Sequence, residues 1–598
     1  MPQNSVNWET DWDVDVGLWR SCGGGHTRPV ADLECVHSGP NAANRVLLAA
    51  QVDQIDHIDA TGILRRLRQM QEVDGGSQHG CLRWYWEEDR PVDTNAAFFT
   101  GLSLIVLWKV YRSRLSGEQR DTLLPILEDL SVWFEGAVEE RSWYYPNKFL
   151  GDLVCAWLLH EIGRSDFPDG GPKSPAPVLL EAADYWLNDG WGWGEHLSDV
   201  YSAVCLDELS VLLLLSDALP QDVRRSYKQL FDDLLGIEDA FAKGPRVPAL
   251  RSYAFQNCPT HTHYRESVKP LPSEIDIRGY GNRALLGHTF HHLDWDELVL
   301  PRRPVRSDVT VECFDGVKAC ARIEDDIRLG SVRRFPLMPS IEHFTHGLAW
   351  QSMPVALARP GKTWAYLQWE TSEDGRVCSH PAEDKKAAYL GNALSEAVHP
   401  PLIGWTWARQ HGTALMALRI MPALSTSWDR LTDRLRVIGD PGENAVRTEK
   451  EGWHQLLLRW AGREVSIHCL PLSSPAEPTI RWPELDGDAE CVDWGLTGSR
   501  EELEGKRLTA TLWAISLDGE IETPPELKKT RIEPAVPRAA GEQGWELDWQ
   551  WPAHHWKLRI DPLGDEPLKD KRKQQDQVDG SGMQIRTWRA WGPLHLLT

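Results

Sequence analysis

Hydrophobic residues recur at helical spacing through the first half of the chain. Between about residue 45 and residue 240 they return every three or four positions, which is the period of an amphipathic helix. The segments with this pattern are 46–72, 94–115, 121–140, 147–163, PVLLEAADYWLN, VCLDELSVLLLLSDAL and QDVRRSYKQLFDDLLG. Most connections are short, and several segments, such as 203–217, are apolar on nearly every side. We therefore expect an N-terminal (α/α) toroid, an incomplete barrel of helical hairpins in which outer helices cover inner ones.

The second half of the chain has a hydrophobic period of two, which is typical of half-buried strands. From about residue 300 the strand-like runs are SDVTVECFDG, VKACARIED, TWAYLQWET, TALMALRIMP, HQLLLRWAGREVSIHCL, RLTATLWAISLDG, WELDWQWP, HWKLRID and MQIRTWRAW. No long helical pattern separates them, so we expect a C-terminal antiparallel β-sheet domain, a β-sandwich. The fold class is α then β, with a helical domain over 1–295 and a β-domain over 296–598.

Composition narrows the classes of ligand. The 598 residues include 30 Trp, more than the 12 Phe and 12 Tyr together, and indoles form stacking surfaces for ring-shaped ligands such as sugars. The formal net charge of −24 argues against non-specific nucleic-acid binding, which needs a basic surface, and indicates a solvated acidic exterior. No apolar run is long enough to span a bilayer, so we expect neither a nucleic acid nor a membrane as partner.

Cysteine usage and the N-terminal sequence bear on compartment and cofactors. The 11 cysteines are scattered singly, in odd number and without CxxC pairs, which indicates neither a disulfide framework nor a cysteine-based zinc site. MPQNSVNWETDWDVDVG lacks the basic and apolar regions of an export signal, which favours a cytoplasmic location; a secreted or periplasmic location is the alternative if a signal is missing. HxH and HH pairs between residues 261 and 292 hint at a divalent metal, but no Asp/His spacing matches them, so we expect no cofactor.

The densest group of candidate functional residues lies in NDGWGWGEHLSDVYSAV, residues 188–204. Glycine-rich turns on a rigid scaffold are where functional side chains concentrate. Here Trp193, Glu195, His196 and Tyr201 stand directly before a long apolar helix. This stretch is therefore the first candidate for a site.

Two further motifs stand at suggestive distances from Tyr201. WYYPNKFLGDL places Asn147 at a helix start, 54 residues before Tyr201, and IEHFTHGLAW supplies His343 and His346, the second 145 residues after it. Each residue also has a structural interpretation. Asn147 can cap the helix that it opens, a serine or aspartate can cap the helix of Tyr201, and a single histidine in a strand is more often structural.

Other side chains are suited to bind a sugar or its carboxylate. CLRWYWEEDRPVDTNAAFF, residues 81–99, is a turn dense in indoles and carboxylates before a helix, although it is also a normal acidic helix start. Between 261 and 292 histidines lie among arginines, whose guanidinium groups match a carboxylate. The candidate substrate-binding residues from these segments are Trp84, Trp86, Glu87, Asp93, Asn95, His263, Arg265 and Arg278, with Arg283 in the same basic stretch.

A helical toroid followed by an antiparallel β-domain, with Asn147, Tyr201 and a histidine in this order, resembles the heparinase II/III-type and related alginate-type polysaccharide lyases. Their separations along the chain are also similar to those of that family. The resemblance implies cleavage of uronic-acid-containing oligo- or polysaccharides by β-elimination. It implies that Asn147 neutralises the substrate carboxylate, while Tyr201 and His346 or His343 transfer protons. The neighbouring Gly347 and the spacing favour His346 over His343.

Two other functions remain open at this stage. A glycoside hydrolase, including the unsaturated-uronyl type, needs paired carboxylates, and Glu87 or Asp93 with Glu195 is a candidate pair. A non-catalytic carbohydrate-binding protein would keep the aromatic groove without any proton transfer. Neither the uronic acid, the linkage nor the oligomeric state follows from the sequence.

Overall fold

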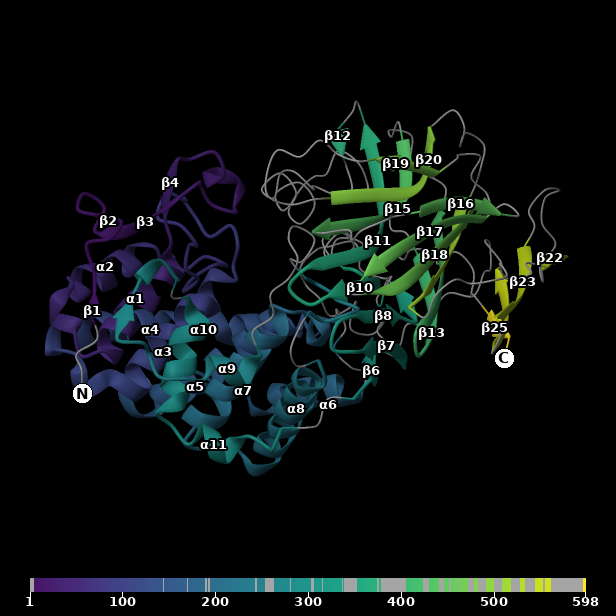
Figure 1. Ribbon diagram of the computed structural model, residues 1–598. Coiled ribbons are helices and arrows are strands. Elements are labelled where there is room, and N and C mark those ends of the chain that lie inside the picture. The colour runs from purple at the N-terminus through teal and green to yellow at the C-terminus, as the bar shows by residue number, and fades with distance from the viewer. Residues whose placement is uncertain are drawn as a thin grey trace. The chain divides into compact units, whose positions relative to one another are not determined.

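The structure is a computed structural model. The residues that it describes are 5–143, 145–168, 170–188, 191, 194–241, 245–252, 263–279, 281–302, 306–314, 316–335, 337, 352–373, 376–377, 405–422, 430–439, 446–450, 453–460, 462–471, 478–481, 491–499, 508–517, 528–532, 544–551, 554–560 and 595–597. The chain divides into two compact units (Figure 1). The first, the helical unit, comprises Met1–Lys243 and His261–Val305, and the second, the β-unit, comprises Gly244–Thr260 and Arg306–Thr598. The chain therefore passes between the two units more than once, whereas the sequence predicts a single boundary after residue 295. That boundary stays a prediction for the division into domains.

The helical N-terminal part expected from the sequence is confirmed. Its α-helices are α1 (Gly39–Gln51), α2 (Ala60–Gln69), α3 (Ala96–Tyr111), α4 (Gly117–Glu139), α5 (Pro146–Asp166), α6 (Ala176–Asn188), α7 (Tyr201–Leu215), α8 (Gln221–Ala240), α9 (Tyr264–Ser267), α10 (Asn282–His291) and α11 (Trp295–Leu298). Short 3₁₀ turns are η1 (Arg28–Val30), η2 (Ile55–His57), η3 (Arg112–Arg114), η4 (Glu195–Leu197) and η5 (Ile277–Gly279). None of the described helices is long and apolar enough to cross a membrane.

Five helices of this unit form a series in which each helix contacts the next. α1 contacts α3, α3 contacts α5, α5 contacts α7, α7 contacts α10, and α10 contacts α1. α3, α5 and α7 are buried at most positions, which explains why their sequences are apolar on nearly every side. The more amphipathic α2, α4, α6 and α8 contact these helices and one another. Helices that pack against neighbours all round are the inner elements of the unit.

The helix expected over 46–72 is interrupted. α1 ends at Gln51, and Asp53 has a φ of 60°, a left-handed conformation that does not continue a helix. α2 begins only at Ala60, where the Asp59 carboxylate accepts a hydrogen bond from the Gly62 amide. This cap adds to the local stability of the second start, so the continuous apolar pattern forms two helices rather than one.

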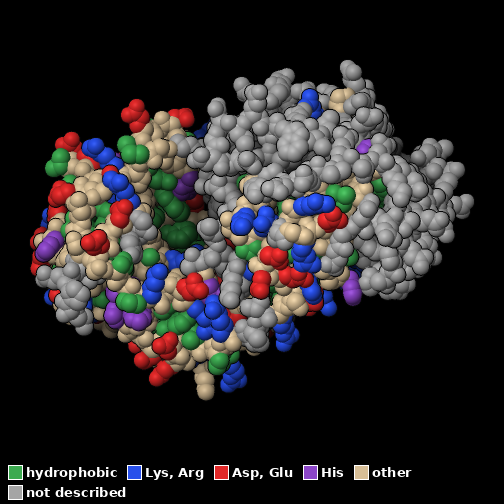
Figure 2. Space-filling model, viewed as in Figure 1, with side chains coloured by type: hydrophobic (Ala, Val, Ile, Leu, Met, Phe, Trp, Pro, Cys, Tyr) green, Lys and Arg blue, Asp and Glu red, His purple; other side chains and the backbone are tan. Residues whose placement is uncertain are grey.

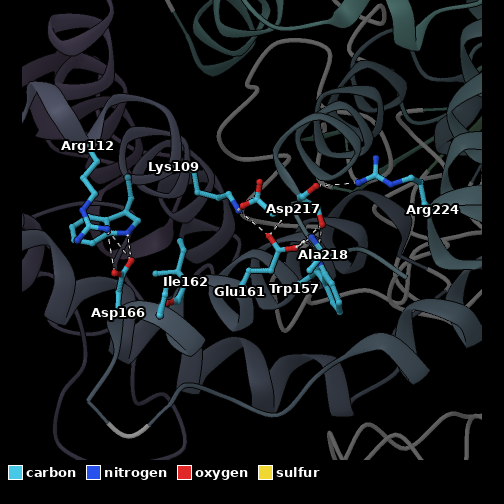
Figure 3. A network of polar contacts seen from close by, with 12 residues as sticks. Lys109, Arg112, Trp157, Glu161, Ile162, Asp166, Asp217, Ala218 and Arg224 are labelled. Atoms are coloured by element: carbon cyan, nitrogen blue, oxygen red, sulfur yellow. Dashed lines mark hydrogen bonds and ion pairs between the residues drawn. The ribbon is translucent and has the colours of Figure 1, made fainter. Parts of the chain in front are cut away.

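A polar network joins the last turns of α3 and α5 to the α7–α8 loop (Figure 3). The Glu161 carboxylate accepts hydrogen bonds from Lys109 Nζ at 2.8 Å, Ser216 Oγ at 2.7 Å and the Ala218 amide at 2.8 Å. Burial alone would raise the pKa of Glu161, but the hydrogen bonds from Lys109 and Ser216 outweigh it and hold that pKa below its ordinary value. The ionised carboxylate therefore stabilises these helix ends.

Short strands accompany the helices. They are β1 (Ser5–Val6), β2 (Trp12–Asp13), β3 (Leu18–Cys22), β4 (Cys35–His37) and β5 (Glu274–Ile275). β2, β3 and β4 form an antiparallel sheet, and β1 pairs with β5 in parallel. The β3–β4 hairpin leads directly into α1, so the residues of its loop are carried on the helical unit.

The antiparallel sheets expected in the second half are confirmed. The strands are β6 (Asp308–Phe314), β7 (Val317–Ile323), β8 (Arg328–Val332), β9 (Arg334–Phe335), β10 (Val355–Arg359), β11 (Thr363–Glu373), β12 (Arg376–Val377), β13 (Trp405–His411), β14 (Ala414–Pro422), β15 (Arg430–Gly439), β16 (Val446–Lys450), β17 (Trp453–Trp460), β18 (Arg463–Pro471), β19 (Pro478–Arg481), β20 (Cys491–Ser499), β21 (Leu508–Ser516), β22 (Lys528–Ile532), β23 (Gly544–Trp551), β24 (His554–Ile560) and β25 (His595–Leu597). The strand expected at MQIRTWRAW lies outside the described residues.

Two large sheets share one hydrophobic core. One has the order β19-β20-β15-β11-β10-β8-β7-β6, with β12 beside β11, and the other has the order β16-β17-β18-β21-β14-β13-β9. Leu357 and Val437 of the first sheet belong to the same buried cluster as Leu415, Ile467 and Trp513 of the second. A further antiparallel sheet has the order β22-β23-β24-β25. The period of two in the sequence thus reflects one face of each large sheet turned toward a common core.

A buried ion pair also joins the two large sheets. Arg419 Nε of β14 lies 2.7 Å from Asp433 Oδ1 of β15, and both side chains are almost completely buried. Trp513 Nε1 and the Thr511 hydroxyl donate to the same carboxylate. Since each polar group has partners, the network fixes the alignment of the sheets rather than leaving a charge unsatisfied.

Candidate functional site

The start of α7 presents Tyr201. The Ser198 hydroxyl accepts hydrogen bonds from the backbone amides of Val200 at 3.2 Å and of Tyr201 at 3.0 Å, so Ser198 satisfies donors at this helix end. Asp199 is therefore not needed for that task. The Tyr201 side chain is half-buried and keeps access to solvent.

The start of α5 is held by Glu195 of η4. The Glu195 carboxylate accepts a hydrogen bond from the Asn147 backbone amide at 2.7 Å and a short one from the Asn147 side-chain amide. Both residues are at most 1% exposed. Asn147 is the second residue of α5 and its side chain does not cap that helix; the carboxylate of Glu195 takes this role from a neighbouring segment. We call this pair the Asn147–Glu195 clamp.

The clamp joins two segments that the sequence analysis treated separately. From the sequence, Glu195 is a candidate functional residue and one half of a possible hydrolase pair. Its complete burial and its two hydrogen bonds to Asn147 give it instead the geometry of a group that positions the start of α5. His196 beside it is 1% exposed, and its ring stacks at 6.4 Å from that of Trp191.

The start of α3 lies next to that of α5. Asn95, which precedes α3, donates from Nδ2 to the Tyr145 hydroxyl at 3.2 Å, and Tyr145 directly precedes α5. Asp93 Oδ1 accepts from the Asn95 amide, and Asp93 Oδ2 lies 2.9 Å from His26 Nε2. Asp93 and Asn95 therefore lie in the same region as the clamp.

His26 is a residue at this site that the sequence analysis missed. Its Nδ1 lies 2.8 Å from the Tyr85 hydroxyl, and its ring meets that of Trp84 edge-on at 4.5 Å. Burial raises the pKa of Tyr85 to about 12, so Tyr85 is a neutral partner of the imidazole. The run of three glycines before His26 was the available signal, because such a run is typical of a loop that packs closely against another segment.

Arg283 provides a cation at the start of α7. Its Nη2 donates to the Val200 carbonyl at 3.1 Å, its Nε lies 3.7 Å from Asp207 Oδ2, and its side chain is 38% exposed. Burial raises the pKa of Asp207 to about 7, although the nearby Arg283 charge lowers it. Arg283 therefore combines a fixed position beside Tyr201 with access to solvent, which a carboxylate-binding group requires.

An acidic side chain of α7, Glu208, is buried within the helical unit. The Glu208 side chain is fully buried, and neither of its oxygens has a hydrogen-bond partner among the described residues. Burial, followed by the charges of Glu195 and Asp207, raises the pKa of Glu208 well above its ordinary value, so the neutral acid is favoured. An ideal Cβ at Gly151 would lie 2.8 Å from Glu208 Oε1 and 2.7 Å from the Phe98 ring. A Cβ at residue 151 would therefore force these neighbours to shift, and glycine avoids this where α3, α5 and α7 approach one another.

Trp86 and Glu87 have partners in other segments. The guanidinium groups of Arg66 and Arg83 lie over the Trp86 ring, at 5.1 and 5.8 Å from its centre. Glu87 Oε1 lies 2.5 Å from His37 Nδ1, and its second oxygen accepts from the His37 amide. These contacts tie the turn before α3 to α2 and β4, which is a structural role for both residues.

The arginines chosen from the sequence are also paired within the protein. Arg265 forms two hydrogen bonds with Asp239, at 3.0 and 2.9 Å, and His263 Nε2 lies 3.2 Å from the same carboxylate. Arg278 lies at the surface with Nε 2.7 Å from Asp11 Oδ2. The structure thus places Arg265 at the end of α8 and Arg278 near the N-terminal strands, and it is Arg283 that reaches the start of α7.

Three candidates lie outside the described residues: Trp193, His343 and His346. Among the described residues no group of three or more His, Cys, Asp or Glu side chains could hold a metal ion. Acidic and basic side chains are interspersed over the described part of the face in Figure 2. That mixture fits a solvated surface rather than a broad basic one.

Comparison with known proteins gives only distant likenesses. No family model and no curated protein matches the chain. Among solved structures, heparinase III is 9% identical, with 87% of this chain and 82% of that chain covered and a TM-score of 0.42. A heparan sulfate lyase mutant from Pedobacter heparinus is 10% identical, with 87% and 82% covered and a TM-score of 0.35. The Streptomyces coelicolor A3 chondroitin AC lyase in complex with chondroitin sulphate is 9% identical, with 88% and 80% covered and a TM-score of 0.41.

These values leave the activity to be argued from the site itself. The chain resembles polysaccharide lyases of the heparinase III and chondroitin AC kinds at low identity and modest TM-score.

Proposed function

We propose that this protein is a lyase that cleaves uronic-acid-containing oligo- or polysaccharides by β-elimination. The helical unit would form the (α/α) toroid expected from the sequence, and the two large sheets the β-sandwich. The observation that carries the proposal is the set of contacts that link the starts of α3, α5 and α7. Asn95 contacts Tyr145, Asn147 contacts Glu195 shortly before α7, and Arg283 contacts the carbonyl of Val200. Helix N-termini and an accessible guanidinium favour an anionic ligand, and a uronate provides a carboxylate on a sugar ring.

Elimination makes three demands on such a site. The uronate carboxylate must be neutralised so that the C5 proton can be removed, a base must take that proton, and an acid must protonate O4 as the C4–O4 bond breaks. The electron pair of the C5–H bond becomes the new C4–C5 double bond. No water is consumed, so the reaction yields one unsaturated uronate and one new hydroxyl group.

The residues present can be matched to these demands. Arg283, whose side chain is 38% exposed, would bind the carboxylate. The sequence resemblance gives the same role to Asn147, whose side-chain amide carries a second N–H group besides the one that Glu195 accepts. Tyr201 would transfer the proton as base or acid. His346 or His343 would be the second acid–base group, as the sequence resemblance implies.

The hydrolase alternative is less well supported by the contacts. Glu195 is bound by Asn147, Glu87 by His37 and Asp93 by His26. A glycosidase needs two carboxylates that act on the same glycosidic bond, and both oxygens of Glu195 already accept hydrogen bonds from Asn147. The pair named from the sequence therefore does not present the geometry that hydrolysis requires.

The proposal is tested by incubating the purified protein with a panel of uronic-acid polymers and oligomers while following two products. A lyase produces an unsaturated uronate, which absorbs in the ultraviolet, together with one new reducing end for each bond cleaved. New reducing ends without this absorbance would establish a hydrolase and overturn the proposal. Binding without either product would assign the protein to the non-catalytic class.

A further inference from the structure

Cys22 and Cys35 form a close cross-strand pair at the end of the β3–β4 hairpin. Their sulfur atoms lie 3.7 Å apart, and the two residues are direct partners in the antiparallel register. The Gly23 amide donates to the Glu34 carbonyl at 2.8 Å, so residues 23 and 34 are a hydrogen-bonded pair. Cys22 and Cys35 are then a non-hydrogen-bonded pair, in which the side chains approach most closely.

The pair meets the geometric needs of a disulfide. In a non-hydrogen-bonded pair the Cα atoms are about 4.5 Å apart, which lies within the range that a disulfide spans. Bond formation requires the sulfurs to approach from 3.7 Å to about 2.05 Å. A side-chain rotation can supply this movement, since Cys22 is exposed and Cys35 is half-buried.

Exposure distinguishes Cys22 from the other described cysteines, of which Cys35 and Cys320 are half-buried and five are buried. Cys81, Cys155, Cys205, Cys313 and Cys469 are buried, and burial raises the pKa of each of these thiols. Such thiols are inert toward reagents in solution, because the thiolate is the reactive form. A soluble disulfide can therefore reach Cys22 in preference to them.

The loop that the pair would close bears on the candidate site. Residues 23–34 lie between the two cysteines and include His26, which contacts Asp93 and Tyr85. Thr27 donates a short hydrogen bond to Glu88, and Val30 packs with Tyr85 in a small buried cluster. A cross-link at the base of this loop would hold His26 against the turn before α3.

We propose that Cys22 and Cys35 are a redox modification site, which a low-molecular-weight disulfide such as glutathione disulfide converts into a reversible intramolecular disulfide. The Cys22 thiolate attacks the reagent and forms a mixed disulfide with release of one glutathione. The Cys35 thiolate then attacks the Cys22 sulfur and releases the second glutathione. Two protein thiols are oxidised and one glutathione disulfide is reduced to two thiols, with no other reactant.

The order of attack follows from the surroundings of the two thiols. Contact with Cys22 raises the pKa of the Cys35 thiol, and Cys22 is the more exposed of the two. Cys22 therefore meets the reagent first, and Cys35 resolves the mixed disulfide.

The test uses the full-length protein, first reduced and freed of reductant, then incubated with glutathione disulfide and quenched by alkylation. We expect peptide mass spectrometry to find Cys22 linked to Cys35, with the mass of two hydrogens lost. In the oxidised protein, amide hydrogen exchange over residues 23–34 should be several-fold slower than in the reduced protein. Dithiothreitol should restore both thiols and the faster exchange.

Matched variants make this result specific. Cys22→Ser should abolish the cross-link and the change in exchange, whereas Cys320→Ser, which removes a half-buried thiol on β7, should leave both intact. A stable glutathione adduct at Cys22, pairing with a different cysteine, or recovery of both thiols in alkylated form would each overturn the proposal. Because the readouts are mass and exchange, the result does not depend on the proposed lyase activity.

Discussion

Replacing Glu195 by glutamine tests whether the Asn147–Glu195 clamp positions the site. Glutamine keeps the shape of the side chain but supplies only one acceptor oxygen, while the clamp uses two. In Glu195→Gln the side-chain NH2 group would face one of the two N–H donors of Asn147, so that hydrogen bond would be lost. A hydrogen bond to a charged acceptor contributes about 1.5–3 kcal/mol, and a carboxylate at a helix start adds about 0.5 kcal/mol. Glutamine costs less to bury than a carboxylate, which leaves an expected net loss of about 2 kcal/mol.

The same change should impair turnover more than stability alone explains. Loss of the contact lets the Asn147 amide rotate, and misplacement of a substrate-binding group by about 1 Å reduces catalysis roughly a hundredfold. We therefore expect kcat/KM, measured by the ultraviolet absorbance of the unsaturated product, to fall by about that factor in Glu195→Gln. Thermal and urea unfolding, followed by circular dichroism, would measure the loss of stability in the same samples.

Glu161→Gln is the matched control at the other end of α5. Glu161 is also a hydrogen-bonded carboxylate with little exposure, since its side chain is 7% exposed, but it contacts the last turn of α3 and the α7–α8 loop. We expect it to lose a similar amount of stability while kcat/KM stays within about twofold of the value for the unmodified protein. Equal effects of the two variants on kcat/KM would refute a positioning role for Glu195.

Three further predictions concern the packing and charges of the helical unit. Gly151→Ala should lower the free energy of unfolding by about 1–2 kcal/mol because its methyl group meets two close neighbours. Gly136→Ala, whose methyl group meets no atom within 4 Å, should raise it by up to about 1 kcal/mol. Urea unfolding measures both changes. The depressed pKa of Glu161 stabilises the fold above the ordinary carboxyl pKa, and this contribution is lost as pH falls through the folded-state value, so acid unfolding should become less steep in Glu161→Gln. Because the pKa of Glu208 is raised in the folded state, the contribution of this residue to the free energy of unfolding falls as pH rises from the ordinary carboxyl pKa toward the raised one. Glu208→Gln should therefore unfold at a higher temperature than the unmodified protein at pH 9 by a larger margin than at pH 5, and an equal margin would contradict the neutral state of Glu208.

The sequence was sufficient where the fold depends on local patterns. α5 begins at Pro146 because proline is favoured in the first helical turn. An apolar run follows this start and also the start of α7 at Tyr201, and the sequence shows both runs. The alternation in Val317, Ala319 and Ala321 likewise marks the buried face of β7. These features are determined by residues close together in the chain, so periodicity and helix-start signals reveal them.

The sequence was insufficient where function depends on pairing between distant segments. Arg265 matched a carboxylate ligand equally well before the structure showed that Asp239 occupies its guanidinium. The link between Asn147 and Glu195 and the approach of Cys22 to Cys35 also follow from tertiary packing. Single-chain spacing cannot show which partner a polar side chain selects, since burial makes that choice between groups far apart in the sequence.

The central claim, elimination with proton transfer by Tyr201, is tested most directly by comparing Tyr201→Phe with Tyr227→Phe. The second variant removes a buried hydroxyl that donates to the Leu179 carbonyl, so it controls for loss of a tyrosine hydroxyl from the same unit. The measurement is the rate of unsaturated uronate formation on the glycan that the unmodified protein cleaves. The account predicts loss of the product in Tyr201→Phe and near-normal formation in Tyr227→Phe. Formation of the unsaturated product by Tyr201→Phe at the rate of the unmodified protein would contradict it.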